Sequence, residues 1–331
     1  MASSSDITSD FERLERAAAL SAPATAKRML VIVNPYATTM SDRLKHLVVY
    51  ALQGRYDVEA VDTQRSGHAT ELCREAANEG YDVVVAFGGD GTVNEAANGI
   101  AGSATPLTCL PGGATNVYCR MLGIPNDVVD ATEHLLGIAD DWHPRPVDLG
   151  MVNGRLFTFS AGAGLDASVV RRVDSHPRLK AQYGPLFYTA SAMAVFLRRY
   201  VVHPPRMVVE VEGSEPVTGV SAFVQNADPY TYFRSRPIEL VEGVELDSGD
   251  LGGVVLQRAS AIDIPTVLWR AMSRRAKIEK HRQVTGFRHV GRVVVRSGDD
   301  RPVPIQVDGD YVGAHDEAVF TIRPNALRVV A

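Results

Sequence analysis

The sequence predicts an α/β fold class, in which a first domain built on a parallel sheet is followed by a β-rich, sandwich-like second domain. Two observations carry this prediction. In the first half, short apolar runs alternate with helical stretches, as in parallel βαβ units with helices on both faces of the sheet. In the second half, strand-like runs dominate. We expect the first domain over 27–146, the second over 147–331 and a poorly ordered leader over 1–26.

The first domain begins with the apolar run Met29–Val33, which stops at Asn34-Pro35 as a buried parallel strand would. Gly80 closes a helix at 68–79, because glycine readily adopts the left-handed conformation of a helix C-terminus. The other elements expected in this domain are strands at 58–63, 81–87 and 105–110 and helices at 93–98 and 116–122.

The second domain follows a stiff, proline-containing connection, Trp142–Pro146. We expect its end to pack back on the cleft between the domains. Its strand-like runs lie at 151–160, 207–211, 219–225, 253–256, 292–296 and 319–322, and its helices at 186–200 and 266–282.

The composition excludes several classes of protein. The chain has 331 residues, 45% hydrophobic and 22% charged, which is typical of a globular protein with substantial cores. Its net charge of −5 provides no overall basic field, so no nucleic-acid partner is expected. Cys73, Cys109 and Cys119 are widely spaced, which favours reduced thiols in a cytoplasm. Because no apolar run is long enough to span a bilayer, we expect any membrane contact to be peripheral, at the inner face.

The strongest chemical signal is a glycine-rich turn between the strand at 81–87 and the next helix. Glycines let the backbone turn tightly and bring N–H groups close to an anion, and the helix start adds partial positive charge. A phosphate group is the expected guest. The turn comprises Gly88, Gly89, Asp90, Gly91, Thr92, Val93, Asn94 and Glu95.

Asp90 distinguishes this turn from an ordinary strand-to-helix turn, which is the plainer interpretation of paired glycines. A carboxylate beside phosphate-binding amides is repulsive unless it holds Mg²⁺ or a substrate hydroxyl. We therefore favour a functional role. Thr92 and Glu95 also fit a capping box, in which Thr92 accepts from the Glu95 amide and the Glu95 side chain reaches back.

A second glycine turn, Pro111–Asn116, lies one βα unit later. Gly112 and Gly113 again permit close backbone approach, and Thr115 is a natural N-cap. Two such turns at the carboxyl ends of neighbouring strands would face the same crevice, which supports a Rossmann-like nucleotide domain. Neither turn matches the P-loop pattern or the Gly-x-Gly-x-x-Gly pattern of dinucleotide sites.

Asp308-Gly309-Asp310 has two interpretations. Asp-Gly between two strand-like runs is a good hairpin turn, and this is the plainer interpretation. The second carboxylate, directly after the turn, allows a role as a metal ligand or a base.

Together these segments resemble the diacylglycerol kinase catalytic family, which includes bacterial lipid kinases and the sphingosine and ceramide kinases. The resemblance runs from about Met29 to the C-terminus. It rests on seven segments in the expected order: Asn34-Pro35, Thr63 with His68-Ala69, Gly88–Glu95, Pro111–Asn116, Asp148-x-Gly150, Gly164-Leu165-Asp166 and Asp308-Gly309-Asp310.

The resemblance implies a kinase that uses ATP and Mg²⁺ to phosphorylate a lipid hydroxyl, with diacylglycerol as the default acceptor and a role in phospholipid biosynthesis. Asp308 is similar to the family's general base, and Asp310 stands where the family usually has Glu. Whether Asp308 or Asp90 takes the proton stays open. Asp148 and Asp166 would line the substrate side. The implied ATP contacts are Asn34, Thr63, Gly88 to Glu95, Gly112, Gly113 and Thr115.

Two stretches depart from the family pattern. The family's structural Mg²⁺ site would fall at 245–251, where Ser248 replaces an expected Asp, which leaves Glu245, Asp247 and Asp250 as weak candidate ligands. The stretch 226–232 replaces a glycine run and puts the identity of the lipid in doubt.

Alternatives to a lipid kinase are a kinase of a soluble acceptor, such as an NAD kinase relative, and a non-catalytic nucleotide- or lipid-sensing module. A homodimer also stays open. The helix at 266–282 could rest on anionic headgroups, or simply present a solvated basic face. Its cationic side chains are Arg270, Arg274, Arg275, Lys277, Lys280 and Arg282.

Overall fold

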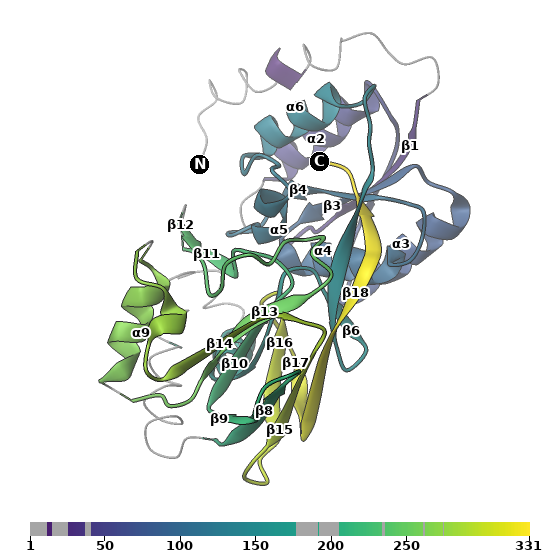
Figure 1. Ribbon diagram of the computed structural model, residues 1–331. Coiled ribbons are helices and arrows are strands. Elements are labelled where there is room, and N and C mark those ends of the chain that lie inside the picture. The colour runs from purple at the N-terminus through teal and green to yellow at the C-terminus, as the bar shows by residue number, and fades with distance from the viewer. Residues whose placement is uncertain are drawn as a thin grey trace. The chain divides into compact units, whose positions relative to one another are not determined.

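The structure is a computed structural model that describes residues 12–14, 26–36, 41–176, 191, 205–233, 236–260, 262–273 and 275–331 (Figure 1). The chain divides into two compact units. Unit 1 comprises Met1–Val147 and Ala326–Ala331, and unit 2 comprises Asp148–Asn325. The helix expected at 186–200 lies outside the described residues except for Ser191, and so does most of the leader expected at 1–26.

Unit 1 is built on a parallel sheet with the strand order β2-β1-β3-β4. All six residues of β3 are buried, as expected for a strand covered on both faces. Val329, at the end of β18 (Glu317–Val329), pairs in parallel with Leu107. Residues 326–331 therefore belong to unit 1, although the residues directly before them belong to unit 2. The four strands are β1 (Arg28–Val33), β2 (Asp57–Asp62), β3 (Val83–Gly88) and β4 (Leu107–Pro111).

The helices of unit 1 cover this sheet in two packed pairs. Helix α3 packs against α4, and α2 packs against α6, and Figure 1 shows the pairs on opposite faces of the sheet. The helix predicted at 68–79 is confirmed, with Gly80 in the left-handed conformation at φ 72°. The helices are α2 (Asp42–Gln53), α3 (His68–Glu79), α4 (Asp90–Ile100), α5 (Val117–Met121) and α6 (Val128–Gly137).

Unit 2 contains an antiparallel six-stranded sheet with the order β14-β13-β10-β7-β16-β17. A second layer pairs β15 with β18 and β8, and β8 with β9. The six-stranded sheet comprises β7 (Ser160–Gly164), β10 (Ser221–Gln225), β13 (Leu251–Leu256), β14 (Val284–Val290), β16 (Val303–Val307) and β17 (Asp310–His315), and the second layer adds β8 (Met207–Val211), β9 (Val217–Gly219) and β15 (Arg292–Ser297).

The two layers of unit 2 share one core. Ala163 and Ile305 of the six-stranded sheet lie in the same buried apolar cluster as Val295 and Phe320 of the second layer. Face-to-face packing of this kind defines a β-sandwich. The predicted fold class, a parallel-sheet α/β domain with a sandwich-like second domain, is therefore confirmed.

The strand predicted at 151–160 is wrong as a single strand. Asn153 and Gly154 have φ values of 47° and 87° and turn the chain between β5 (Arg145–Val152) and β6 (Arg155–Phe157). Two successive positive φ values fit a tight hairpin turn, for which Asn-Gly is the preferred pair.

The long helix predicted at 266–282 is also wrong. Helix α9 spans only Asp263–Ala271, and the chain continues through a turn into the short 3₁₀ helix η2 (Ile278–Lys280). The Ser273 hydroxyl accepts from the amide of Ala276, at 3.1 Å. A serine side chain that binds nearby amides competes with the helical backbone, which explains the early end.

Candidate functional site

The two glycine turns of unit 1 stack on each other. Strand β3 ends at Gly88, Gly89 is the N-cap of α4, and the Gly112 amide donates to the Gly88 carbonyl at 2.8 Å. A Cβ atom added to Gly113 would lie 2.8 Å from the Gly89 Cα. Since no side chain fits at that distance, the glycines let two backbone turns lie together at the carboxyl ends of neighbouring strands.

Asn34 connects the first strand to this turn. Its Nδ2 donates to the Thr92 hydroxyl at 3.2 Å, and its Oδ1 accepts from the Tyr36 amide at 2.9 Å. The Asn34 side chain is therefore held at both ends. Because the Thr92 oxygen accepts from Asn34, its own proton can point toward another acceptor, such as a phosphate oxygen. Thr63 directly follows β2, and its amide donates to the Val33 carbonyl at 2.8 Å.

Asp90 is the first residue of α4. Its Oδ1 accepts from the amide of Tyr118 at 3.0 Å, in the first turn of α5. A carboxylate at the start of a helix interacts favourably with the unpaired amides there. Asp90 thus ties the first glycine turn to the helix that follows the second one.

The predicted capping box is wrong. Helix α4 begins at Asp90, two residues before Thr92. The Glu95 carboxylate instead accepts from the amides of Gly67 and Ala69, at 2.8 and 3.3 Å. Glu95 therefore caps the start of α3, a neighbouring helix, and these contacts indicate a structural role.

The prediction that Thr115 is an N-cap is wrong. The N-cap of α5 is Asn116, in a left-handed conformation at φ 48°. Its side chain accepts from the Gly113 amide at 2.8 Å and donates to the Gly113 carbonyl at 2.9 Å. Asn116 was missed as a site residue, although Asn adopts the left-handed conformation more readily than most residues other than Gly.

Unit 2 contains the Asp308 hairpin. Asp308 and Gly309 have φ values of 46° and 88° between β16 and β17, so the predicted Asp-Gly hairpin is confirmed. Asp308 is buried, and its carboxylate accepts four hydrogen bonds, of 2.7 to 3.1 Å. The donors are the Thr158 amide and hydroxyl and the amides of Phe159 and Ser160. Both oxygens are engaged, which is typical of a carboxylate that organises a loop.

Removing the Asp308 carboxylate is expected to destabilise unit 2. An Asp308→Ala variant would leave four buried donors without their acceptor, and we expect a loss of about 4 kcal/mol in the free energy of unfolding. Urea unfolding followed by circular dichroism measures this. A loss below about 1 kcal/mol would contradict the structural role, and Asp316→Ala, at an exposed residue of the β17–β18 turn, is the control.

Asp166 lies in a polar cluster with Tyr230 and Gln306. Its Oδ2 accepts from the Tyr230 hydroxyl at 2.6 Å and from the Gln306 amide at 2.7 Å. Burial raises the pKa of the Asp166 carboxyl above its usual value, and the two hydrogen bonds oppose that shift. Gln306 Oε1 in turn accepts from the Gly309 amide at 2.9 Å, which joins the cluster to the hairpin that begins at Asp308.

Asp148 has a different environment from Asp166. It is buried, and its two oxygens accept from the amides of Gly249 and Asn325, at 2.6 and 2.8 Å. These contacts indicate that Asp148 holds the chain near Gly249. Neighbouring Gly150 has no room for a side chain, since a Cβ would lie 2.0 Å from the Phe157 ring.

The candidate metal ligands are spread over an exposed turn. Glu245 and Asp247 are exposed, and the Asp250 carboxylate interacts with the Ser248 hydroxyl at 2.9 Å and with His289 at 2.6 Å. Within the described part of the chain, no group of three or more His, Cys, Asp or Glu side chains could hold a metal ion.

Asp228 was missed by the sequence analysis, although it lies in the unusual stretch 226–232. Its Oδ1 is buried and has no hydrogen-bond partner among the described residues. Burial raises the pKa of its carboxyl to about 7, and nearby Glu239 adds to the shift. An acid in a solvated loop and one in this environment look alike in sequence.

The raised pKa of Asp228 predicts a pH-dependent stability. Between about pH 4 and 7 the folded state holds a proton that the unfolded state has lost, so this group's contribution to stability falls as pH rises through that window. Because the side chain is partly exposed, we expect Asp228→Asn to gain only about 1–2 kcal/mol at pH 8. At pH 4 we expect no gain.

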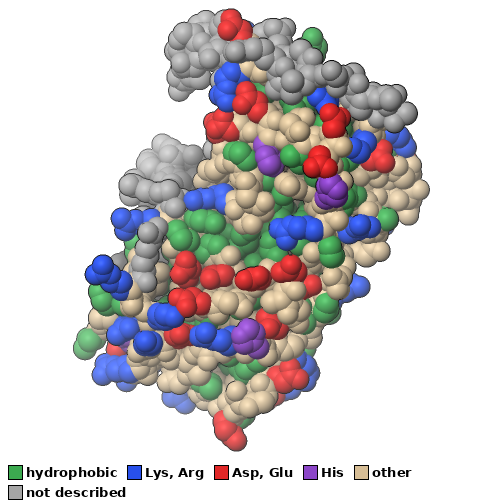
Figure 2. Space-filling model, turned by 45° about the horizontal axis from the view of Figure 1, so that its top comes forward, with side chains coloured by type: hydrophobic (Ala, Val, Ile, Leu, Met, Phe, Trp, Pro, Cys, Tyr) green, Lys and Arg blue, Asp and Glu red, His purple; other side chains and the backbone are tan. Residues whose placement is uncertain are grey.

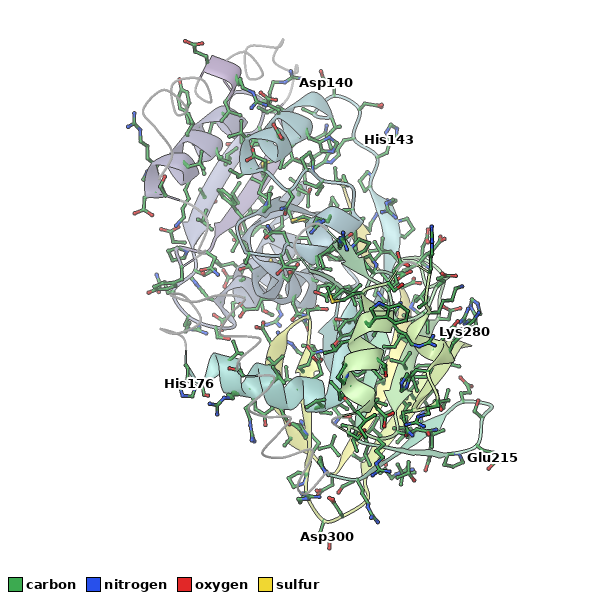
Figure 3. All side chains as sticks on the ribbon, turned by 90° about the vertical axis from the view of Figure 1, so that its left-hand side faces the viewer. Asp140, His143, His176, Glu215, Lys280 and Asp300 are labelled. Carbon is green, nitrogen blue, oxygen red and sulfur yellow. The ribbon has the colours of Figure 1, made fainter. Side chains whose placement is uncertain are left out.

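Urea unfolding of both proteins at the two pH values measures this difference. Glu215→Gln, at an exposed residue of the β8–β9 turn (Figure 3), controls for loss of a carboxylate. An equal effect of Asp228→Asn at pH 4 and 8 would contradict the assigned titration.

Comparisons of the sequence with known proteins point to diacylglycerol kinases. Residues 28–152 match the family model described as the diacylglycerol kinase catalytic domain. The chain is 33% identical over 195 residues to the diacylglycerol kinase of Bacillus subtilis (strain 168), covering 56% of this chain and 60% of the relative. It is 27% identical over 294 residues to the diacylglycerol kinase of Staphylococcus aureus (strain MRSA252), covering 87% of both chains.

Solved structures share the fold. A crystal structure of a diacylglycerol kinase from Bacillus anthracis str. Sterne has a TM-score of 0.68 at 19% identity, over 93% of this chain and 98% of that one. A second crystal structure from the same organism has a TM-score of 0.72 at 22% identity, over 94% and 97%. At these identities the likeness concerns the fold.

Proposed function

We propose that this chain acts as a member of the diacylglycerol kinase catalytic-domain family and transfers the γ-phosphoryl group of ATP to the hydroxyl group of diacylglycerol, giving phosphatidic acid. The observation that carries the proposal is the stacking of two glycine turns, at Gly89 and Gly113, directly before Asp90 and α4. Stacked turns with a helix start and a carboxylate are suited to phosphate groups that arrive with a cation.

The residues of unit 1 would bind and orient the phosphates. The backbone at the start of α4 supplies amides and partial positive charge, and Asn34 orients the Thr92 hydroxyl. Mg²⁺ bound with ATP would neutralise part of the developing phosphate charge. Asp90 fits such an ion, because Mg²⁺ in nucleotide sites needs only one or two carboxylates besides the phosphates.

The residues of unit 2 would act on the acceptor. The acceptor oxygen forms a bond to the γ-phosphorus as the bond from that phosphorus to the β–γ bridging oxygen breaks, and the hydroxyl proton goes to a carboxylate. We assign the proton to Asp310. Asp308 is a poor acceptor, since four donors already engage it. Asp166, with Tyr230 and Gln306, would contact the polar end of the acceptor.

A transfer assay tests this function. The protein is incubated with ATP labelled in the γ-phosphate, Mg²⁺ and diacylglycerol in mixed micelles, with ceramide, sphingosine and NAD as competing acceptors. Labelled phosphatidic acid that disappears in Asp90→Asn would support the proposal. Label on NAD would instead identify a soluble-acceptor kinase, and ATP binding without transfer would indicate a sensing module.

A further inference from the structure

Helix α9 of unit 2 presents an unusual apolar surface. Among the described residues of unit 2, every large hydrophobic side chain that is exposed lies on α9 or beside its ends. Trp269 is 62% exposed and Ile262 81% exposed. We call Ile262, Leu268, Trp269 and Met272 the α9 apolar face. Large exposed side chains gathered in one place usually mark an interaction surface.

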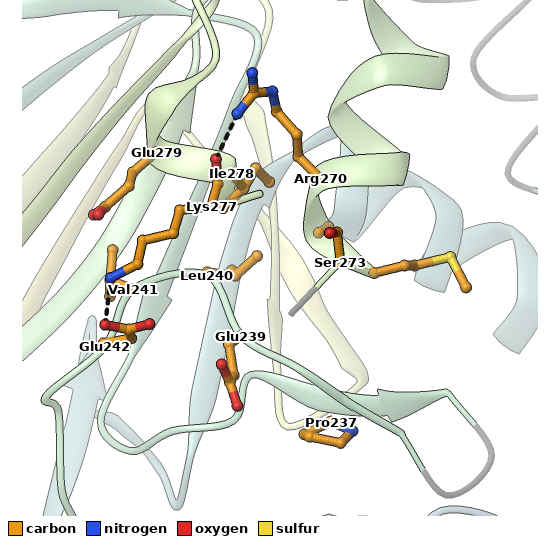
Figure 4. A pocket seen from close by; sticks show the side chains of 12 residues that line it. Pro237, Glu239, Leu240, Val241, Glu242, Arg270, Ser273, Lys277, Ile278 and Glu279 are labelled. Atoms are coloured by element: carbon orange, nitrogen blue, oxygen red, sulfur yellow. Dashed lines mark hydrogen bonds and ion pairs between the residues drawn. The ribbon is translucent and has the colours of Figure 1, made fainter. Parts of the chain in front are cut away.

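The opposite face of α9 fixes the orientation of the helix. Val267 is buried in a cluster with Leu240 and Ile278, so this side packs on the unit. The Thr266 hydroxyl pairs with His281 at 2.9 Å, and the Arg270 guanidinium donates to the Lys277 carbonyl at 3.2 Å (Figure 4). The apolar face is therefore held outward by contacts at several points along the helix.

The pocket next to the end of α9 does not explain this surface. Its cavity volume is about 30 Å³, which is room for a few water molecules at most. Its charged side chains include both cations and acids, and Lys277 already pairs with Glu242. A lipid chain does not fit there.

The stretch of chain that contains α9 is strongly basic. Residues 258–288 contain eight Lys or Arg and two acids, a net +6, although the whole chain has a net charge of −5. Two of these cations pair with the two acids, Arg282 with Asp263 and Arg288 with Glu279. Arg258, Arg275 and Lys280 form no ion pair among the described residues, and all three are exposed. Figure 3 shows Lys280 beside α9, and Figure 2 shows Lys and Arg side chains gathered on the same side of the unit.

We propose that the α9 apolar face and the exposed cations of residues 258–288 form a docking surface for an anionic phospholipid bilayer. Trp269 and Leu268 would enter the boundary between headgroups and acyl chains, while Arg275 and Lys280 bind anionic headgroups. An apolar helix face, together with exposed cationic side chains in the same segment of the chain, fits a bilayer better than a purely polar partner. The surface stands on these side chains alone, and only its use in reaching a lipid acceptor rests on the proposed function.

Co-sedimentation with vesicles tests this surface. The full chain is mixed with vesicles of phosphatidylcholine alone, or of phosphatidylcholine with about 30% phosphatidylglycerol, at low and at high salt. We expect binding to the anionic vesicles only, weakened by salt. Leu268→Ser with Trp269→Ser should weaken binding at least tenfold, and Arg275→Glu with Lys280→Glu should do the same.

Matched controls lie on unit 1. Tyr50→Ser is the control for the apolar variant, because Tyr50 is 62% exposed like Trp269. Arg43→Glu with Arg74→Glu is the control for the charge reversal, because both arginines are exposed. In a Trp142→Phe protein, Trp269 is the remaining tryptophan, and its emission should shift to the blue with anionic vesicles. Phosphorylation of a short-chain, monomeric diacylglycerol by the same variants is a separate readout, which binding variants should leave unchanged.

Three results would overturn the proposal. The first is binding to anionic vesicles that survives both α9 double variants, and the second is no binding to these vesicles at low salt. The third is a concentration-dependent dimer, seen by light scattering, that Trp269→Ser abolishes, because the apolar face would then belong to a second copy. If vesicle binding follows the α9 residues but no acceptor is phosphorylated, the docking surface stands and the proposed activity fails.

Discussion

An Asp310→Asn variant is expected to lose phosphoryl transfer by a factor of about 10²–10⁴, while its fold and its ATP affinity stay close to those of the parent. The amide has nearly the same shape as the carboxylate but cannot take the acceptor's proton. Asp310 is half-buried at the start of β17, directly after the turn that Asp308 anchors. The rate of transfer at saturating ATP and diacylglycerol measures the loss.

Asp310→Glu is the matched control for this prediction. It keeps the carboxylate and lengthens the side chain by one methylene group, so we expect it to retain at least about a tenth of the parent activity. Asp308→Asn separates catalysis from structure, since it should lower the free energy of unfolding, which Asp310→Asn should not. If Asp310→Asn kept full activity and Asp308→Asn lost it without loss of stability, Asp308 would be the base.

The strands and helices of unit 1 could be predicted because their signals are local. The burial of Val83–Gly88 and the helix closed by Gly80 follow from runs of a few residues each. The failures have local causes too. The Asn153-Gly154 turn was visible in sequence as a hairpin signal, and the Ser273 turn ended a helix whose basic pattern continued through Arg282.

The candidate site could be predicted by residue type but not by partner. Glu95 fits a capping box with Thr92 in sequence, yet it caps α3 because Gly67 and Ala69 lie close only in the fold. Asp308 has the carboxylate that a general base needs, but the Thr158 amide that donates a hydrogen bond to it is 150 residues away along the chain. Motif spacing therefore located the carboxylates, whereas their division into structural and reactive groups depended on tertiary contacts.

The second large effect is expected at the contact between the two glycine turns. A Gly113→Ala variant would place a Cβ 2.8 Å from the Gly89 Cα and 3.1 Å from Asn116 Oδ1. Both the Gly89 backbone and the Asn116 side chain are fixed by hydrogen bonds, so the turns must separate at a cost of about 1–3 kcal/mol. Because the same turns would hold the phosphates, we expect ATP to bind about 10–100-fold more weakly.

Equilibrium binding of ATP to the folded variants, by calorimetry or a fluorescent analogue, measures the Gly113 effect directly. Gly137→Ala is its control, because no atom lies within 4 Å of a Cβ built on Gly137, at the end of α6. Alanine there should leave ATP affinity unchanged and raise stability slightly, since it restricts the unfolded chain. Parent-like ATP affinity in Gly113→Ala would mean that ATP does not bind at the stacked turns, and the proposed site would then have to be sought elsewhere in unit 1.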